Sequence, residues 1–433
     1  MSRKMNDSGV DWIGQIPEHW SVQRVSQAFT FKKSKANVEN PVILSLARDG
    51  IKVRDISNNE GQIAESYYNY NPVEIGDFLL NVMDLYSGAN CNVSNIEGVI
   101  SPAYANLRYR DNINPYFYDY YFKVQYWQMA MFAHGKGVSF DHRWTINKSD
   151  LLQYDIPKLP FAEQNEIVEV INSKIYSVNH LIKIQEKSLD KLFEYKQSVI
   201  NRFVIEGIKP NQNYRENQQT WYDRIPIEWK VEKMKFNFLF GKGLSITKED
   251  LKEEGIKTIS YGEVHSKYPM RFNSSINYLK CVDVSYLSTN FKSILKNGDF
   301  IFADTSEDIN GSGNYSMNEG DEVFAGYHSI IVRNNDKRVI NKYLQYLFFS
   351  DSWRYQVRCG VVGIKVYSIS QKLLKNCFYI IPPLEDQVLI CDFLDKMTGA
   401  IDKLIKIKKQ KIEKLNEYKK SIIYEYVTGK KEV

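Results

Sequence analysis

The sequence predicts an α+β protein in which two globular domains are joined by two long antiparallel coiled-coil helices, with a pseudo-twofold internal duplication. Three observations carry this prediction. Segments of the first half recur in the second half, two long segments carry apolar residues at heptad spacing, and the remaining sequence alternates short β-rich runs with turns. The 433 residues are 43% hydrophobic, which is enough to build real cores and excludes wholesale disorder.

The duplication first shows in two short motifs. The pattern Trp-x-x-x-Ile-Pro-x-x-Trp begins at Trp12 and again 209 residues later at Trp221, and Gly-Asp-Phe begins at Gly76 and again 222 residues later at Gly298. The offset therefore grows by 222 − 209 = 13 residues, so the second copy carries an insertion between the two motifs. The chain is expected to run as body, helix, body, helix.

The two most similar segments predict the helices. Residues 160–204 and 383–427 share 15 identities in 45 aligned pairs. Both follow proline and end near glycine, at Gly207 and Gly429, as helix boundaries do. Each helix is expected to pair with the other and to keep apolar surface for a further subunit; an ordinary core helix is the alternative. The residues predicted at the helix pairing or subunit interface are Ile171, Val178, Leu181, Leu192, Val199, Leu394, Ile401, Leu404, Leu415 and Ile422.

The remaining sequence forms two bodies, each expected to be a compact α+β domain. One aromatic-rich helix is predicted in each, near residues 116–132 and 342–357. The boundaries that follow are residues 1–159 for the first body, 160–207 for the first helix, 208–382 for the second body and 383–433 for the second helix.

Composition narrows the class of protein. Five cysteines without CxxC spacing argue against a disulfide framework and a cysteine-rich zinc site. No apolar run is long enough to cross a bilayer, and the N-terminal residues lack the apolar core of a secretory signal, so we expect a cytoplasmic protein without a membrane partner. The net charge of +5 permits nucleic-acid binding but does not establish it.

A search for catalytic motifs gives no candidate. The sequence lacks the P-loop of ATPases and a glycine-rich cofactor turn with the Pro-Pro-aromatic motif of a DNA methyltransferase, so no catalytic, cofactor-binding or metal-binding residue is predicted. The carboxylates of Asp304, Glu307, Asp308, Asp321 and Glu322 suit a divalent metal. A solvated acidic loop is the more frequent explanation of such a cluster, and the first copy has no matching one.

Glycine-rich basic loops offer better candidates for binding. Glycine lets a backbone approach a ligand closely, and Lys and Arg meet phosphates or guanine edges. One such loop precedes each long helix, and a plain surface loop is the alternative for any single residue. The predicted DNA-binding candidates are Arg48, Lys52, Arg54, Lys136 and Arg143 in the first body, with Lys242, Tyr261, His265, Lys267 and Lys365 in the second.

The motifs and their order resemble the specificity subunit of type I restriction-modification enzymes. The resemblance rests on the Trp-x-x-x-Ile-Pro-x-x-Trp pattern, on the step from Pro160 to Gln164 and from Pro383 to Gln387 into a long helix, and on the duplication. It implies two target recognition domains, each binding one half of a bipartite double-stranded DNA target. It also implies two methyltransferase subunits and two motor-nuclease subunits as partners, with S-adenosylmethionine, ATP and Mg on those subunits and none in this chain.

Two other function classes stay open at this point. One is a self-sufficient DNA methyltransferase or nuclease with its own recognition domain, which the missing motifs disfavour. The other is a duplicated protein-binding adaptor without nucleic acid, which the modest net charge permits. The expected role is a subunit that is non-catalytic by itself.

Overall fold

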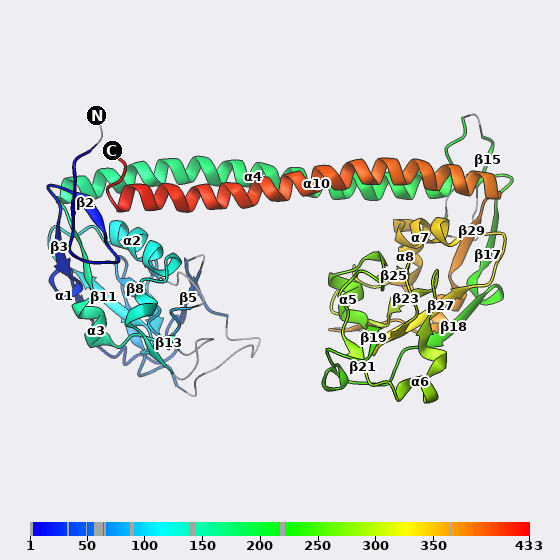
Figure 1. Cartoon of the computed structure of the whole chain (residues 1–433), viewed down its shortest axis with the longest axis horizontal. Coiled ribbons are helices and arrows are strands. Elements are labelled where there is room, and N and C mark those ends of the chain that lie inside the picture. Colours follow the sequence, from blue (N-terminus) through cyan, green and yellow to red (C-terminus); the bar gives the residue numbers. More distant parts are fainter. Residues whose placement is uncertain are drawn as a thin grey trace. The chain divides into compact units, whose positions relative to one another are not determined.

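The computed structural model describes residues 3–32, 34–48, 50–55, 64, 66–86, 91–137, 144–210, 212–216, 221–222, 224–363 and 365–433. The chain divides into two compact units, residues 1–186 with 410–433 (unit 1) and residues 187–409 (unit 2). Each unit contains one body and part of both long helices, α4 (Phe161–Glu206) and α10 (Leu384–Val427) (Figure 1). No helix within the described ranges has the length and apolar content to span a membrane.

The body of unit 1 is built around a four-stranded antiparallel sheet. Its strand order is β4 (Phe29–Phe31), β11 (Ala105–Tyr109), β8 (Phe78–Leu80) and β9 (Cys91–Val93). Helix α2 (Pro115–Trp127) begins where Asn114 caps the amide of Tyr116 and proline occupies the first turn. Its residues Phe117 and Phe122 are fully buried in the core that also holds the sheet. Two-stranded pairs complete the body: β1 (Met5–Asp7) with β2 (Gln15–Pro17), β3 (Ser21–Arg24) with β14 (Asp155–Lys158), β5 (Leu44–Ala47) with β6 (Gly50–Val53), β7 (Asn71–Val73) with β10 (Gly98–Ile100), and β12 (Lys136–Gly137) with β13 (Trp144–Thr145).

Unit 2 repeats this architecture and extends it. Its five-stranded sheet has the order β18 (Phe238–Lys242), β27 (Ser329–Asn334), β23 (Phe300–Ala303), β25 (Tyr315–Asn318) and β20 (Met270–Phe272). A second sheet has the order β21 (Cys281–Val282), β19 (Ile256–Ile259), β26 (Val323–Ala325) and β22 (Ile294–Leu295). The remaining pairs are β15 (Tyr214–Glu216) with β16 (Arg224–Pro226), β17 (Lys230–Lys233) with β29 (Phe378–Ile381), and β24 (Thr305–Ser306) with β28 (Tyr367–Ser368).

The duplicated Gly-Asp-Phe motif occupies the same place in both units. Asp77 precedes β8, is fully buried, and accepts hydrogen bonds from the backbone N–H of Glu74 at 2.8 Å and from Arg108 Nη1 at 2.9 Å. Asp299 precedes β23 and accepts from the backbone N–H of Lys296 at 2.9 Å and from Arg333 Nε at 2.8 Å. The repeated aspartate therefore closes the turn and pairs with an arginine of the adjoining strand, which explains its presence in both copies.

The predicted aromatic-rich helix of the second body is wrong as a single element. It is divided into α7 (Asn341–Phe349) and α8 (Asp351–Gly360). Ser350 between them has extended backbone angles, and its side chain accepts a hydrogen bond from the amide of Trp353. The serine thus caps a new helix instead of continuing the old one. In the first body, α2 ends at Trp127 and a 3-10 turn covers Met131–His134.

The long helices run antiparallel where they meet inside each unit. In unit 1, Lys419 Nζ donates to Asn179 Oδ1 at 3.1 Å, and Ile171, Val178 and Ile422 are buried in one core. In unit 2, Lys196 forms an ion pair with Asp402 at 2.7 Å, while Val199 and Leu394 share the other core. Ile401 is also buried, Leu192 and Leu415 are half-buried, and Leu181 and Leu404 are exposed.

The two copies of the Trp-x-x-x-Ile-Pro-x-x-Trp motif fasten each body to a helix. The indole N–H of Trp20 donates to Glu163 at 3.0 Å, and that of Trp229 donates to Asp386 at 3.2 Å. Both tryptophans are buried, so their indole donors need a partner. Burial opposes the effect, but hydrogen bonds from Arg3, His19 and Trp20 hold the pKa of Glu163 below its usual value. A carboxylate in the first turn of each long helix therefore binds the body that precedes that helix.

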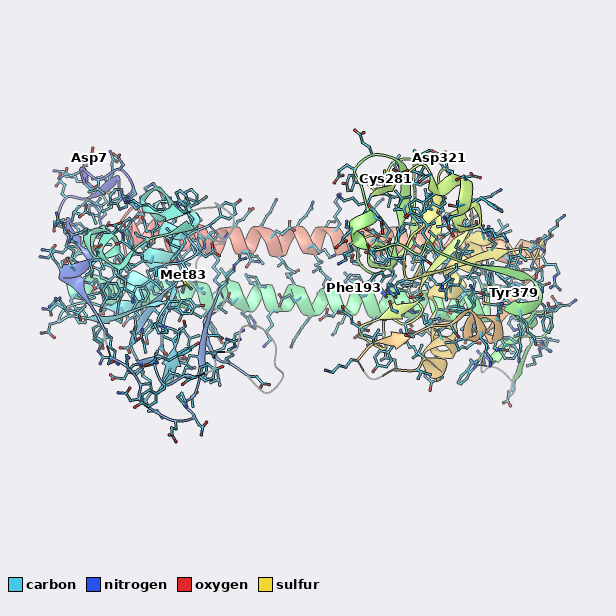
Figure 2. All side chains as sticks on the ribbon, turned by 90° about the horizontal axis from the view of Figure 1, so that it is seen from below. Asp7, Met83, Phe193, Cys281, Asp321 and Tyr379 are labelled. Atoms are coloured by element: carbon cyan, nitrogen blue, oxygen red, sulfur yellow. The ribbon has the colours of Figure 1, made fainter. Side chains whose placement is uncertain are left out.

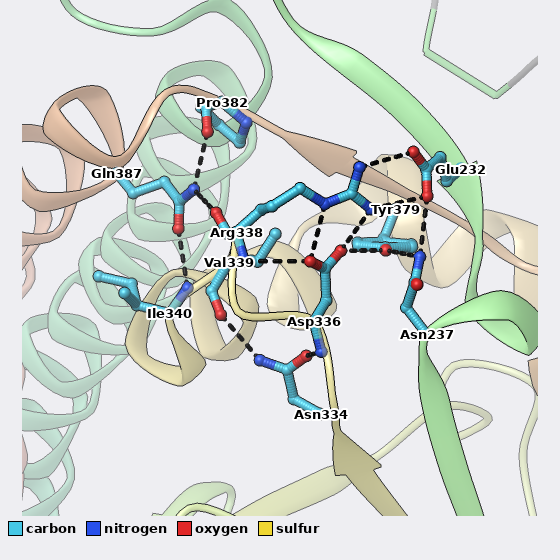
Figure 3. Close-up of polar contacts among 10 residues, drawn as sticks. All are labelled: Glu232, Asn237, Asn334, Asp336, Arg338, Val339, Ile340, Tyr379, Pro382 and Gln387. Carbon is cyan, nitrogen blue, oxygen red and sulfur yellow. Dashed lines mark hydrogen bonds and ion pairs between the residues drawn. The ribbon is translucent and has the colours of Figure 1, made fainter.

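A buried glutamine completes each joint. Gln387 donates from Nε2 to the carbonyls of Arg338 and Pro382, both at 2.7 Å, and accepts the N–H of Ile340 at 2.8 Å (Figure 3). Gln164 makes the same three kinds of bond in unit 1, to the carbonyls of Asn112 and Leu159 and from the N–H of Asn114. One side chain thus satisfies three backbone groups of the segments that meet at the helix start.

Replacing Gln387 by leucine is expected to destabilise unit 2 strongly. The variant removes the partner of one part-buried N–H and of two carbonyls, one of them buried, and each buried group left unsatisfied costs about 1–3 kcal/mol. We expect a loss of about 2–5 kcal/mol in the free energy of unfolding, measured by urea denaturation of the full chain. Gln410→Leu, an exposed position on the same helix, is the matched control. Equal stabilities of the two variants would contradict the role of the joint.

Candidate nucleic-acid interface

Unit 2 contains a cleft of about 610 Å³ formed by segments distant in the sequence. One wall is α5 (Tyr261–Ser266), and the opposite side is the loop of residues 305–314, whose first residues form β24. The pairing of β24 with β28 brings residue 366 to the same cleft. The lining residues are Lys248, Tyr261, Gly262, His265, Thr305, Ser306, Glu307, Asp308, Gly311, Asn314, Tyr327, His328 and Val366.

A hydrogen-bond network holds α5 to the 305–314 loop. His265 Nε2 lies 2.8 Å from the carbonyl of Thr305, and its Nδ1 lies 2.8 Å from Nδ2 of Asn314. Since a carbonyl only accepts and an amide nitrogen only donates, this geometry selects the neutral ring with its proton on Nε2. His265 is therefore a structural support of the cleft and has no ring nitrogen left for a ligand.

Arg354 of α8 also holds the 305–314 loop by hydrogen bonds. Its Nη2 donates to the carbonyl of Asn310 at 2.6 Å and to Oδ1 of Asn314 at 2.5 Å. Burial, and to a smaller extent the neighbouring charge of Arg358, lower the pKa of Arg354 to about 10. The guanidinium stays charged at neutral pH and fixes the loop through charge-assisted bonds.

Aromatic rings also line the cleft. The ring centroid of Tyr261 lies 5.6 Å from that of Tyr327 and 5.4 Å from that of His328, all in edge-to-face arrangements. His328 has a φ of +53°, which lies in a backbone region that residues other than glycine seldom adopt. Its Nδ1 lies 3.2 Å from Oδ1 of Asp304. The strained backbone is held by its surroundings, as is common at binding sites.

The carboxylates of Asp308 and Glu307, which both line the cleft, differ in their hydrogen bonds. Asp308 Oδ1 accepts the N–H of Gly311 at 2.7 Å and so closes the loop on itself. Glu307 is exposed, and no hydrogen bond or ion pair within the described residues engages its carboxylate. Among the described residues, no three His, Cys, Asp or Glu side chains are grouped to hold a metal ion. The cleft can therefore recognise a ligand by hydrogen bonds, and the Glu307 carboxylate is an acceptor available for such a bond.

The structure places several predicted DNA-binding candidates at this cleft. Tyr261 and His265 line it, Lys267 follows α5, and Lys365 adjoins Val366. Lys242 ends β18 and precedes Gly243, whose N–H donates to the carbonyl of Ser329. A Cβ atom at Gly243 would lie 2.0 Å from the carbonyl oxygen of Gly326, so only glycine fits there. Gly241, Lys242 and Gly243 thus lie where β18 meets the start of β27, directly after His328.

The candidates of unit 1 lie on two separate hairpins. Arg48, Lys52 and Arg54 belong to the β5–β6 hairpin or its immediate end, and Lys136 lies on β12 opposite Thr145. In unit 2, an isolated bridge joins Val362 and Ser368 in the segment that precedes the second long helix. Arg143 lies outside the described residues. All these DNA contacts remain predictions.

Sequence reasoning missed Arg354, Tyr327 and His328, and it placed Glu307 only in an acidic cluster. Arg354 and Arg358 share one face of α8 at a spacing of four, but that spacing is common on solvated helices. Tyr327 and His328 reach the cleft only through the pairing of β27, which no local pattern indicates.

Comparison with known proteins gives one consistent family. The family described as type I restriction modification DNA specificity domain matches residues 226–417. The MjaVIII specificity subunit of a type I restriction enzyme from Methanocaldococcus jannaschii is 22% identical over 96% of this chain and 94% of its own. The putative MjaX specificity subunit of the same organism is 23% identical over 96% and 95%.

A solved structure shares the fold. It comes from a study of complex assembly and conformational transition of the type I R-M system, and superposes with a TM-score of 0.67 at 14% identity. It covers 96% of this chain and 99% of that chain. The family match covers residues 226–417, and the two specificity subunits are similar to this chain over almost its whole length, so the sequence is similar to the specificity subunits of type I restriction enzymes.

Proposed function

We propose that this chain recognises a bipartite double-stranded DNA target, with each body binding one half, and that it performs no catalytic step itself. The observation that carries the proposal is the duplication of a whole body with its joint to a helix. Trp20 with Gln164 and Trp229 with Gln387 fasten two bodies of the same architecture to two equivalent helices. Two related readers on one chain fit a target with two separated halves.

The long helices are proposed to dock two methyltransferase subunits. Leu181 and Ile184 are each 45% exposed in unit 1, and the equivalent Leu404 and Ile407 are 48% and 57% exposed in unit 2. Residues three apart share one helix face, so each pair forms a small apolar patch. Phe193, labelled in Figure 2, is another exposed apolar residue of α4. Two equivalent patches support two copies of one partner.

The chemistry is assigned to those partners. S-adenosylmethionine belongs to the methyltransferase subunits in this proposal, and ATP and Mg to two motor-nuclease subunits. Duplicated recognition without a duplicated catalytic motif favours this division over a self-sufficient methyltransferase or nuclease. The adaptor alternative is less favoured because free lysines surround the cleft of unit 2.

Methylation mapping with an exchanged body tests the proposal. The full chain, assembled with its methyltransferase partner, is expected to methylate a random duplex library at a target with two fixed halves. Exchange of residues 1–159 for another body of the family should alter one half and leave the other intact. Change of both halves in an assembled complex, or methyl transfer by the rigorously purified chain alone, would contradict it.

A further inference from the structure

We infer that the cleft of unit 2 reads a cytosine in the major groove, with the Glu307 carboxylate accepting a hydrogen bond from the cytosine N4 amino group. This inference rests on the proposed DNA-recognition function and adds a residue and a base to it. Glu307 is the natural contact because its carboxylate is free within the described structure, whereas Asp308 beside it is used to close the loop.

The chemistry of a carboxylate restricts the base. An ionised carboxylate only accepts hydrogen bonds, and the amino donors in the major groove are N4 of cytosine and N6 of adenine. Adenine also presents its N7 acceptor next to N6, which faces a carboxylate unfavourably. Guanine presents only acceptors and thymine an acceptor with a methyl group. Cytosine is therefore the base that leaves no repulsive contact.

Lysines around the cleft supply the complementary attraction to the phosphates. Lys248 lines the cleft, Lys267 and Lys365 lie within two residues of lining side chains, and Lys242 ends the strand next to His328. All four are exposed, and no ion pair in the described part of the chain occupies them. A basic rim around an acceptor fits duplex DNA, because phosphate contacts position the protein while base contacts specify the sequence.

The rigid surroundings of Glu307 give the contact its selectivity. The 305–314 loop is fixed by His265 from α5 and by Arg354 from α8. The loop cannot move away from a wrong base without breaking those bonds. A carboxylate pressed against an acceptor then loses water without gaining a partner, and this penalty discriminates between bases.

Glu307→Gln in the full chain, assembled with the methyltransferase partner, tests the inference. The probe is a duplex library randomised at both halves of the target, and the readout is methylation at each sequence. The wild type should prefer cytosine at one position of the half assigned to unit 2 by about 5- to 150-fold, the range of a single base contact. The variant should lose most of that preference and keep every other position.

The control is Glu254→Gln, an exposed glutamate of the same unit that does not line the cleft. It should keep the wild-type target. An unchanged cytosine preference in Glu307→Gln would overturn the inference, and so would an assembled variant that weakens all sequences equally. A wild-type complex without any bipartite target would instead overturn the proposed function.

A binding measurement on single duplexes separates a contact from an indirect effect. Replacing the cytosine pair by a thymine–adenine pair should weaken the wild-type complex by the same fold-change and the Glu307→Gln complex by little. Additive losses from the protein and DNA changes would show that the two do not touch and would also overturn the inference.

Discussion

A chain carrying Leu181→Gln with Ile184→Gln is expected to bind one methyltransferase subunit instead of two. These side chains are 45% exposed, so their replacement should leave the fold of unit 1 intact, and glutamine keeps the helix propensity. Full burial of such a side chain contributes about 1.5–3 kcal/mol, and roughly half of that remains for a side chain that is already half covered. Losing two should weaken the docking by a factor on the order of ten to a hundred.

The equivalent change in unit 2 provides the internal comparison. Leu404→Gln with Ile407→Gln should remove the other copy, and all four changes together should leave the chain without partners. Native mass spectrometry of the mixed subunits counts the copies directly. Lys183→Gln with Lys406→Gln, exposed residues beside the same patches, is the matched control. Two bound copies on the fourfold variant would exclude these patches as docking sites.

Inserting one heptad into both long helices is expected to lengthen the spacer between the two halves of the DNA target. The insertion points are after Glu186 and after Lys409, which are equivalent at the 223-residue offset and mark the boundary of the compact units. Seven residues make almost two whole turns, so the apolar stripe continues in register. The added length is about 10 Å at 1.5 Å per residue.

This length corresponds to roughly three base pairs at 3.4 Å each. Three base pairs also rotate the duplex by nearly a third of a turn, so the longer chain is expected to bind more weakly or to adopt a compromise spacing. Methylation mapping of the doubly extended chain gives the spacer, and both half-site sequences should stay the same. An active complex with the original spacer would exclude the helices as the element that sets the distance.

The sequence predicted the two long helices and singled out the residues of the joints, though not their contacts, because both sets of residues recur in the two copies. The second tryptophan of the motif and the glutamine after proline satisfy fixed partners at the first turn of a helix, so both copies retain them. Heptad spacing identified Ile171, Val178, Val199, Leu394 and Ile422, all buried. These features are local, or repeat at a constant offset.

The cleft of unit 2 was much less predictable. Its lining comes from separate segments that strand pairing brings together, and the two bodies do not share these residues, so the duplication gives no help. The division of residues 342–357 into two helices depended on one serine whose capping role appears only in three dimensions. Residues that contact bases are exposed, so neither hydrophobic periodicity nor expected burial predicts their positions from the sequence.

Each compact unit takes core residues from both repeats, and this has a consequence for how the chain is made. The core of unit 1 needs Ile422, Ile423 and Tyr426 from the end of α10, whereas unit 2 lies entirely within residues 187–409. On the ribosome, the first body emerges early but lacks part of its apolar cover until the last helical residues have left the exit tunnel. Unit 2 closes over a shorter stretch of chain and can fold first. The order of folding is thus expected to run opposite to the order of synthesis.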